Sequence, residues 1–194
     1  MISVRRARAA DAVAIGAVHV AAWRSAYPGI LPDTYLASLS VARYAAYYDA
    51  VIRSPTAVFV ADATRADAPS GSPRAAERPR VVGFATAARS RSGAEFGHRP
   101  GEGEIETLYV LDDWRERGIG RRLMHAAAAR LAEAGCRSVF LWVLRDNPSR
   151  WFYQHLGGKP LAEATIQFAG RDVMQTAFVW DPIERLLAAS PQES

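Results

Sequence analysis

The segment from Arg115 to Arg122 has the residue types of an anion-binding turn. It consists of Arg-Glu-Arg-Gly-Ile-Gly-Arg-Arg and comes just before apolar residues at helical spacing. Free backbone N–H groups at a helix start, the positive end of the helix dipole and glycines together favour close approach by a phosphate. One such dipole contact contributes only about 0.3–1 kcal/mol, so several amides and arginines must act together. The pattern predicts a pyrophosphate ligand; alternatively, Gly118 and Gly120 only shape a tight turn.

Two other kinds of phosphate loop are excluded by residue type. A Walker loop ends in Gly-Lys-Ser/Thr, but the single lysine, Lys159, lies far along the chain. A dinucleotide fingerprint needs a third glycine at the position where Leu123 stands. The turn therefore predicts neither a P-loop nucleotidase nor a dinucleotide site.

Two carboxylates and one tyrosine could move protons. Glu104 and Glu106 lie two residues apart in an expected strand, so strand alternation predicts that both point to the face shared by Leu108 and Val110. Either could be a general base, directly or through water; solvent-exposed strand carboxylates are the competing interpretation. The Tyr153 phenol, with an ordinary pKa of about 10, could protonate a basic leaving group, or it could simply be a packed helix aromatic.

Strands and helices alternate along the chain in an order that would position these residues. Helices are expected over about 11–27, after Pro32, over 41–53 and 118–134, and after Pro148, and strands over 3–7, 56–61, 80–87, 104–111, 138–143, 159–168 and 172–180. Strand, helix and strand between 104 and 143 form a β-α-β unit. The order predicts one α/β domain over 1–194, with a central mixed sheet flanked by helices.

Two loops, a tail and a dimer contact are also expected. The stretches 62–79 and 90–103 contain Pro, Ser, Gly and Arg without hydrophobic periodicity. They are expected to be mobile loops. Residues 188–194 are expected to form a tail. The last strand and the segment 180–187 could form a homodimer contact.

Composition limits the class of protein. The chain has 194 residues, 49% hydrophobic and 23% charged, with a mean hydropathy of −0.09, which is typical of a folded domain. No stretch approaches membrane-spanning length and no secretory signal is recognised, so we expect a cytoplasmic protein without a membrane partner. Cys136 is the single cysteine and no histidine has a second ligand at metal-like spacing, so neither a disulfide framework nor a metal site is expected.

The positive charge has two interpretations. The net charge is +4 and the pI about 9.6, but the arginines are spread over the chain rather than gathered in one run. We therefore expect no nucleic-acid partner. A basic nucleic-acid binder remains the competing hypothesis, and its affinity would fall steeply with salt.

Around the turn, the sequence resembles the GCN5-related N-acetyltransferase (GNAT) family. The family signature at this turn is Arg/Gln-x-x-Gly-x-Gly/Ala, which Arg115, Gly118 and Gly120 match, and the resemblance extends to segments 104–110 and 147–158. It implies a GNAT-like acyl-CoA N-acyltransferase fold. It also implies direct transfer of the acetyl group of acetyl-CoA to a primary amine of a small molecule or peptide. The alternative is a non-catalytic acyl-CoA-binding regulatory module, which would not need the acid and base candidates.

The resemblance also implies roles for particular residues. In the family the turn binds the coenzyme's pyrophosphate and the preceding strand pairs with its pantetheine arm. The implied cofactor-binding residues are Leu108, Tyr109, Val110, Arg115, Glu116, Arg117, Gly118, Ile119, Gly120, Arg121, Asn147 and Tyr153.

The same resemblance implies catalytic and acceptor-binding residues. Tyr153 would protonate the departing thiolate, the Val110 N–H would donate to the thioester oxygen, and a glutamate at the position of Glu104 is often the base. The early helical region resembles the one that covers the acceptor site. It implies that Trp23, Tyr27 and Tyr35 bind substrate, with an ordinary aromatic core as the alternative.

Overall fold

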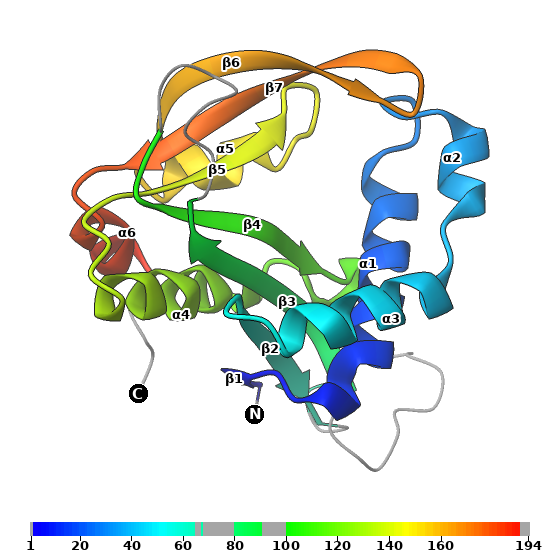
Figure 1. The fold of residues 1–194 in the computed structure, drawn as a ribbon, viewed down its shortest axis with the longest axis horizontal. Helices are drawn as coiled ribbons and strands as arrows, with labels where there is room; N and C mark the ends of the chain where they lie inside the picture. The colour runs from blue at the N-terminus through cyan, green and yellow to red at the C-terminus, as the bar shows by residue number, and fades with distance from the viewer. Residues whose placement is uncertain (1, 65–66, 68–79, 91–99, 191–194) are drawn as a thin grey trace.

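A computed structural model describes residues 2–64, 67, 80–90 and 100–190 (Figure 1). Within them, one seven-stranded sheet has the order β1-β2-β3-β4-β5-β7-β6. Its strands are β1 (Ser3–Arg6), β2 (Ala57–Ala63), β3 (Arg80–Arg89), β4 (Gly103–Val110), β5 (Val139–Leu144), β6 (Lys159–Phe168) and β7 (Arg171–Trp180). Only the β4–β5 pair is parallel. The sheet is therefore mixed, as expected.

Helices cover both faces of the sheet. They are α1 (Ala12–Ala26), α2 (Asp33–Ser38), α3 (Val41–Ile52), α4 (Ile119–Glu133), α5 (Arg150–His155) and α6 (Glu184–Ala189). Helices α1 and α3 pack over β2 and β3 on one face, whereas α4, α5 and α6 pack on the other (Figure 1). At Gly16, a Cβ would lie 2.8 Å from the Ala45 backbone nitrogen, so glycine allows α1 and α3 to approach closely.

The central strands and α4 follow the hydrophobic pattern of the sequence. Every residue of β2 is buried, as expected for a strand with a helix layer on each face. In α4 the buried positions Ile119, Leu123, Ala127 and Leu131 recur at spacings of four. Their common stripe fixes α4 against the sheet and so fixes the turn that precedes it.

Strands β4 and β5 run side by side for only a short distance. They pair at Gly103 with Val139 and at Glu104 with Phe140. Beyond these pairs β4 continues to Val110 and β5 to Leu144 without pairing to each other. The separation leaves one edge of each strand facing an opening in the sheet.

The β6–β7 hairpin reaches from the far edge of the sheet to the end of α1. Ile166, Phe168 and Val173 pack with Tyr27 and Leu31 in one apolar cluster. Figure 1 shows the hairpin tip beside α2. The hairpin therefore closes one side of the space above the β4–β5 opening.

Expected and observed elements agree to within two residues at most boundaries. Residues 62–63 extend β2, Gly103 begins β4 and residues 188–189 belong to α6, so these positions of the expected loops and tail are regular structure. The rest of 62–79 lies outside the described residues apart from 64 and 67, as do 91–99 and 191–194. In the part of the chain that is described, no helix has the length and apolar character needed to cross a bilayer.

The segment 180–187 packs inward. Trp180, Ile183 and Leu186 are buried together with side chains of α4 and α5. These three side chains are therefore part of the core, and a homodimer contact at this segment stays a prediction.

Candidate active site

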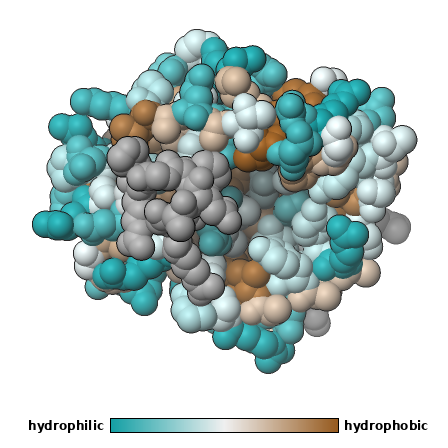
Figure 2. Space-filling model, turned by 45° about the horizontal axis from the view of Figure 1, so that its top comes forward, coloured by the Kyte–Doolittle hydropathy of each residue, from teal (hydrophilic) through white to brown (hydrophobic). Residues whose placement is uncertain are grey.

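A cavity of about 630 Å³ occupies the space where β4 and β5 separate. Its walls come from β4, β5, the ends of α1 and β6, and the starts of α4 and α5. Figure 2 shows a hollow near the middle of this side of the molecule, with apolar side chains at its rim. The cavity brings together most of the residues singled out in the sequence.

At one end of the cavity lies the turn that starts α4. Glu116 and Gly118 have positive φ values of 59° and 73°, and the Arg122 N–H makes the first helical bond, to the Gly118 carbonyl at 3.0 Å. The amides before Arg122 therefore have no acceptor within the helix. A left-handed turn with free amides is a concave anion-binding site. Gly120 lines the cavity, and a Cβ there would lie 3.2 Å from the Phe152 ring.

The arginines of the turn are not equivalent. Arg115 and Arg121 line the cavity, and Arg115 pairs with Asp112 at 2.8 Å. Arg117 does not line it, because its guanidinium lies over the Trp114 ring, 5.1 Å from the centroid, and donates to the Asp67 carbonyl at 2.8 Å. The structure thus does not place Arg117 in the predicted cradle.

Backbone groups of β4 point into the opening. The Leu111 N–H donates to the Val82 carbonyl at 2.9 Å, on the β3 side. Backbone N–H groups alternate in direction along a strand, so those of Val110 and Leu108 point the other way, toward β5. Both residues line the cavity, as does Tyr109. The Val110 N–H, which the family resemblance implies as the donor to the thioester oxygen, therefore faces the opening between β4 and β5.

A β-bulge at Glu106 changes the face on which the glutamates lie. Thr107 pairs with Thr86 and Ile105 with Ala87, so Glu106 has no partner on β3. The extra residue shifts the side-chain alternation by one. Leu108 and Val110 pack toward α4, whereas Glu106 accepts from Thr86 on the α1–α3 face. The prediction that the glutamates share the face of Leu108 and Val110 is therefore wrong.

Glu106 is the end of a chain of hydroxyl groups that lie mostly inside the protein. Thr86 Oγ1 donates to Glu106 Oε2 at 3.3 Å and lies 2.9 Å from Thr107 Oγ1. Thr107 hydrogen-bonds Tyr48, whose hydroxyl lies 2.8 Å from His19 Nδ1. The Thr86 hydroxyl gives its proton to Glu106, so Thr107 is the donor in the Thr86–Thr107 bond. The chain of hydroxyl groups holds the Glu106 carboxylate in place.

The two glutamates have different surroundings. Glu106 lines the cavity and Glu104 does not. Burial, together with the nearby charge of Glu106, raises the pKa of Glu104 to about 7. Two acidic groups whose environments differ in this way can take different roles in proton transfer.

Tyr153 and Asn147 lie on the α5 side of the cavity. Tyr153 is 7% exposed, and burial, followed by its neighbour Tyr27, raises the pKa of its phenol. It therefore keeps its proton throughout the neutral range. Asn147 Oδ1 accepts from the Ser149 N–H at 2.9 Å, and its Nδ2 donates to the Tyr27 hydroxyl at 3.4 Å. Both Tyr153 and Asn147 line the cavity.

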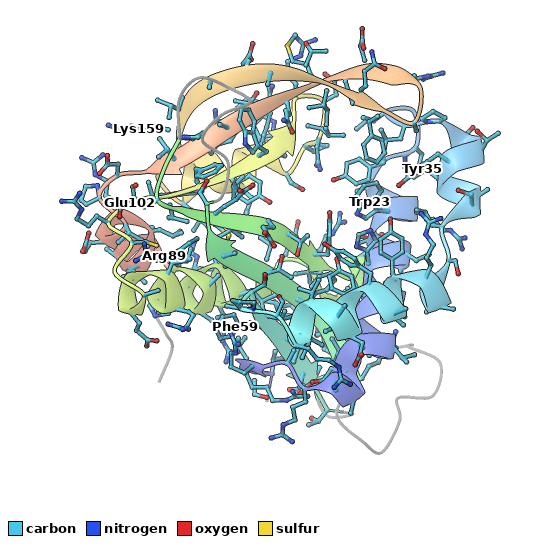
Figure 3. The ribbon with its side chains drawn as sticks, viewed as in Figure 1. Trp23, Tyr35, Phe59, Arg89, Glu102 and Lys159 are labelled. Atoms are coloured by element: carbon cyan, nitrogen blue, oxygen red, sulfur yellow. The ribbon has the colours of Figure 1, made fainter. Side chains whose placement is uncertain are left out.

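Aromatic rings form the other end of the cavity. Trp23 and Tyr27 line it as expected, but Tyr35 does not; its ring packs against Phe168 at 5.1 Å between centroids. Figure 3 shows Trp23 and Tyr35 beneath the tip of the β6–β7 hairpin. Sequence reasoning missed Phe168 and Trp142, which also line the cavity. The alternating apolar residues of 164–168 indicate that one face of that strand is covered, but not by what.

Comparisons with known proteins agree with this geometry. The profile of the acetyltransferase (GNAT) family matches residues 30–157. YuaI of Bacillus subtilis, an uncharacterised N-acetyltransferase, is 32% identical over 186 residues, which are 96% of each chain. The chain belongs to the GNAT family and is an acetyl-CoA-dependent N-acetyltransferase. The family and enzyme class predicted from the sequence are confirmed.

Solved structures share the fold at low sequence identity. The PaiA N-acetyltransferase of Thermoplasma acidophilum, in complex with coenzyme A, has a TM-score of 0.63 at 17% identity over 91% of this chain and 98% of its own. YncA of Salmonella typhimurium, with its cofactor acetyl-CoA, has a TM-score of 0.61 at 19% identity over 93% of each chain. The predicted fold class is confirmed.

Proposed function

We propose that this enzyme acetylates a primary amine of a small molecule or peptide, which binds between Glu106 and the β6–β7 hairpin. The observation that carries the proposal is the continuity of the cavity. It runs from the α4 turn, along the open edge of β4, to Glu106 and the aromatic rings. One cavity therefore offers a site for a diphosphate, a track of backbone amides and a base.

The residues at the turn and on β4 fit the coenzyme. The left-handed turn at Glu116 and Gly118, with Arg115 and Arg121, would hold the diphosphate, because free amides and cations converge there. The N–H groups of Leu108 and Val110 would pair with the amide groups of the pantetheine arm. When bound, acetyl-CoA supplies the acetyl group as a thioester.

The chain's own groups would then move the protons. Glu106 would take the proton of the incoming amine, because it lines the cavity and Thr86 holds its carboxylate in place. Glu104, two residues earlier on β4, would serve as a second proton site. The Val110 N–H would donate to a carbonyl oxygen, and Tyr153 holds a hydroxyl proton that a departing thiolate can take.

Calorimetry and thiol release together test this proposal. We expect acetyl-CoA to bind the purified chain at two salt concentrations, with thiol released only when an amine is added. A non-catalytic module would bind acetyl-CoA and release no thiol with any amine. A nucleic-acid binder would show no heat with acetyl-CoA and a steep loss of DNA affinity with salt. Absence of acetyl-CoA binding would overturn the proposal.

A further inference from the structure

The acceptor end of the cavity is bounded by flat and apolar side chains. Trp23 and Tyr27 come from the end of α1 and the residue after it, Trp142 from β5, and Ile166 and Phe168 from β6. The Trp23 ring lies 4.9 Å from that of Tyr27, edge to face, and 5.7 Å from that of Phe168. Trp23 thus lies at the centre of a ring cluster to which helix and hairpin both contribute (Figure 3).

Charge is scarce at this end. Among the described residues that line the cavity, the charged side chains are Glu106, Arg115, Glu116 and Arg121. The last three belong to the α4 turn, and Arg115 is already paired with Asp112. Glu106 is therefore the one charged side chain, among the described residues that line the cavity, that lies outside the α4 turn.

This lining restricts the chemistry of the acceptor. Apolar rings desolvate an ammonium group and lower its pKa, which favours the neutral nucleophile, and Glu106 can take the proton. If the acceptor carried a carboxylate beside its amine, that carboxylate would be buried without a cationic partner. If it carried a second ammonium group, that group would be buried without a second carboxylate on the cavity wall. Ring faces favour a flat group through offset or edge-to-face contacts.

We infer that the acceptor is a monoamine whose amino group is carried by an aromatic or similarly flat apolar group. Such an acceptor bears neither a carboxylate nor a second ammonium. The inference rests on the proposed function, since it specifies what binds at the same site.

A panel of matched amines tests the inference through initial rates of thiol release from acetyl-CoA. The panel is 2-phenylethylamine, phenylalaninamide, phenylalanine and 1,4-diaminobutane. We expect kcat/KM for 2-phenylethylamine to exceed that for phenylalanine and diaminobutane by about a hundredfold. Phenylalaninamide, which has the bulk of phenylalanine without its charge, should be closer to 2-phenylethylamine. A preference for phenylalanine or diaminobutane would overturn the inference.

Variants test whether the rings are responsible. Trp23→Leu and Phe168→Leu should each raise KM for 2-phenylethylamine about tenfold, since each removes one ring contact. KM for acetyl-CoA should not change. Trp151→Leu is the matched control, because Trp151 is 53% exposed and does not line the cavity. An unchanged amine KM in both ring variants would refute the role of the cluster.

A binding measurement separates this inference from the proposed transfer. Calorimetry of 2-phenylethylamine into the protein saturated with coenzyme A reports acceptor binding without turnover. Binding here without thiol release in the kinetic assay would refute the transfer and support the acceptor class. Acetylation of another amine without binding of 2-phenylethylamine would refute the acceptor class and support the transfer.

Discussion

Glu106 has two kinds of neighbour, a cavity on one side and a chain of hydroxyl groups on the other. The bulge makes this possible, because it places Glu106 and Thr107 on the same face of β4. The Thr86 hydroxyl donates to Glu106 Oε2 at 3.3 Å and so fixes the position of the carboxylate. Thr86 is therefore a positioning residue for the proposed base.

The first prediction concerns Thr86. In Thr86→Val, the Glu106 carboxylate loses the hydroxyl group that holds it, so kcat/KM should fall about tenfold at the acidic end of the pH profile. At high pH, kcat/KM should stay close to that of the parent. Steady-state rates across pH give the measurement. Thr86→Ser, which keeps the hydroxyl, is the control. A parallel drop at every pH in Thr86→Val would indicate a purely structural role.

The second prediction concerns Tyr153. Tyr153→Phe keeps the ring that packs in the core and removes the phenolic proton. Turnover should fall about a hundredfold, in the range typical of general acids, with KM for acetyl-CoA nearly unchanged. Rates of thiol release measure both quantities. Unchanged turnover would assign the acid to another group, whereas a raised KM alone would assign Tyr153 to binding.

At the scale of elements, the turn and α4 form one unit. The stripe of buried side chains holds α4 against the sheet, and the two positive-φ residues then direct the amides of the turn toward the cavity. Gly120 lies where this unit meets α5, next to Phe152. A side chain at Gly120 therefore competes with both the Phe152 ring and any anion in the turn.

The third prediction is that Gly120→Glu abolishes acetyl-CoA binding. Its carboxylate would repel the diphosphate, and its Cβ would crowd Phe152. Calorimetry should detect no binding, and circular dichroism should show a folded chain. Gly120→Ala is the control, because it adds the crowding without the charge and should retain weakened binding. Full affinity in Gly120→Glu would place the diphosphate elsewhere.

The order of elements could be predicted from the sequence because each element carries a local pattern. The turn from Arg115 to Arg122 is also local, so its position at a helix start was predictable. The face of Glu106 was not, because the bulge arises from pairing with Thr86, twenty residues earlier. Phe168 was missed for a similar reason, since its partners lie on α1 and α2.

At the scale of the molecule, the buried His19 makes stability depend on pH. It is 5% exposed, stacks on Tyr44 at 3.8 Å between centroids and contacts Tyr48. Burial lowers the pKa of His19 from 6.5 to about 4. The folded chain therefore keeps His19 neutral in a pH range where the unfolded chain protonates it.

The fourth prediction follows from that difference. Between pH 6.5 and 4 the unfolded state binds more protons at His19, so the free energy of unfolding falls as the pH falls through this window. The loss should reach about 2 kcal/mol by about pH 5. Urea unfolding gives the free energy of unfolding of the parent and of His19→Gln at about pH 7.5 and at about pH 5. The contribution of His19 is the change, between the two pH values, in the difference between parent and variant.

The comparison with the variant is needed because Glu104 acts in the opposite direction. Its pKa is raised to about 7, so its contribution to stability increases as the pH falls through 7. A parent and a variant with the same pH dependence would contradict the assignment to His19.

Because β4 and β5 are joined by two residue pairs, the sheet has a gap between the rest of these strands. A pantetheine arm, which has amide groups of its own, can occupy this gap and hydrogen-bond as an additional strand would. A ligand that binds only the native state stabilises it by an amount that grows with the logarithm of the ligand concentration. The lifetime of the folded enzyme should therefore lengthen as its acyl donor becomes abundant.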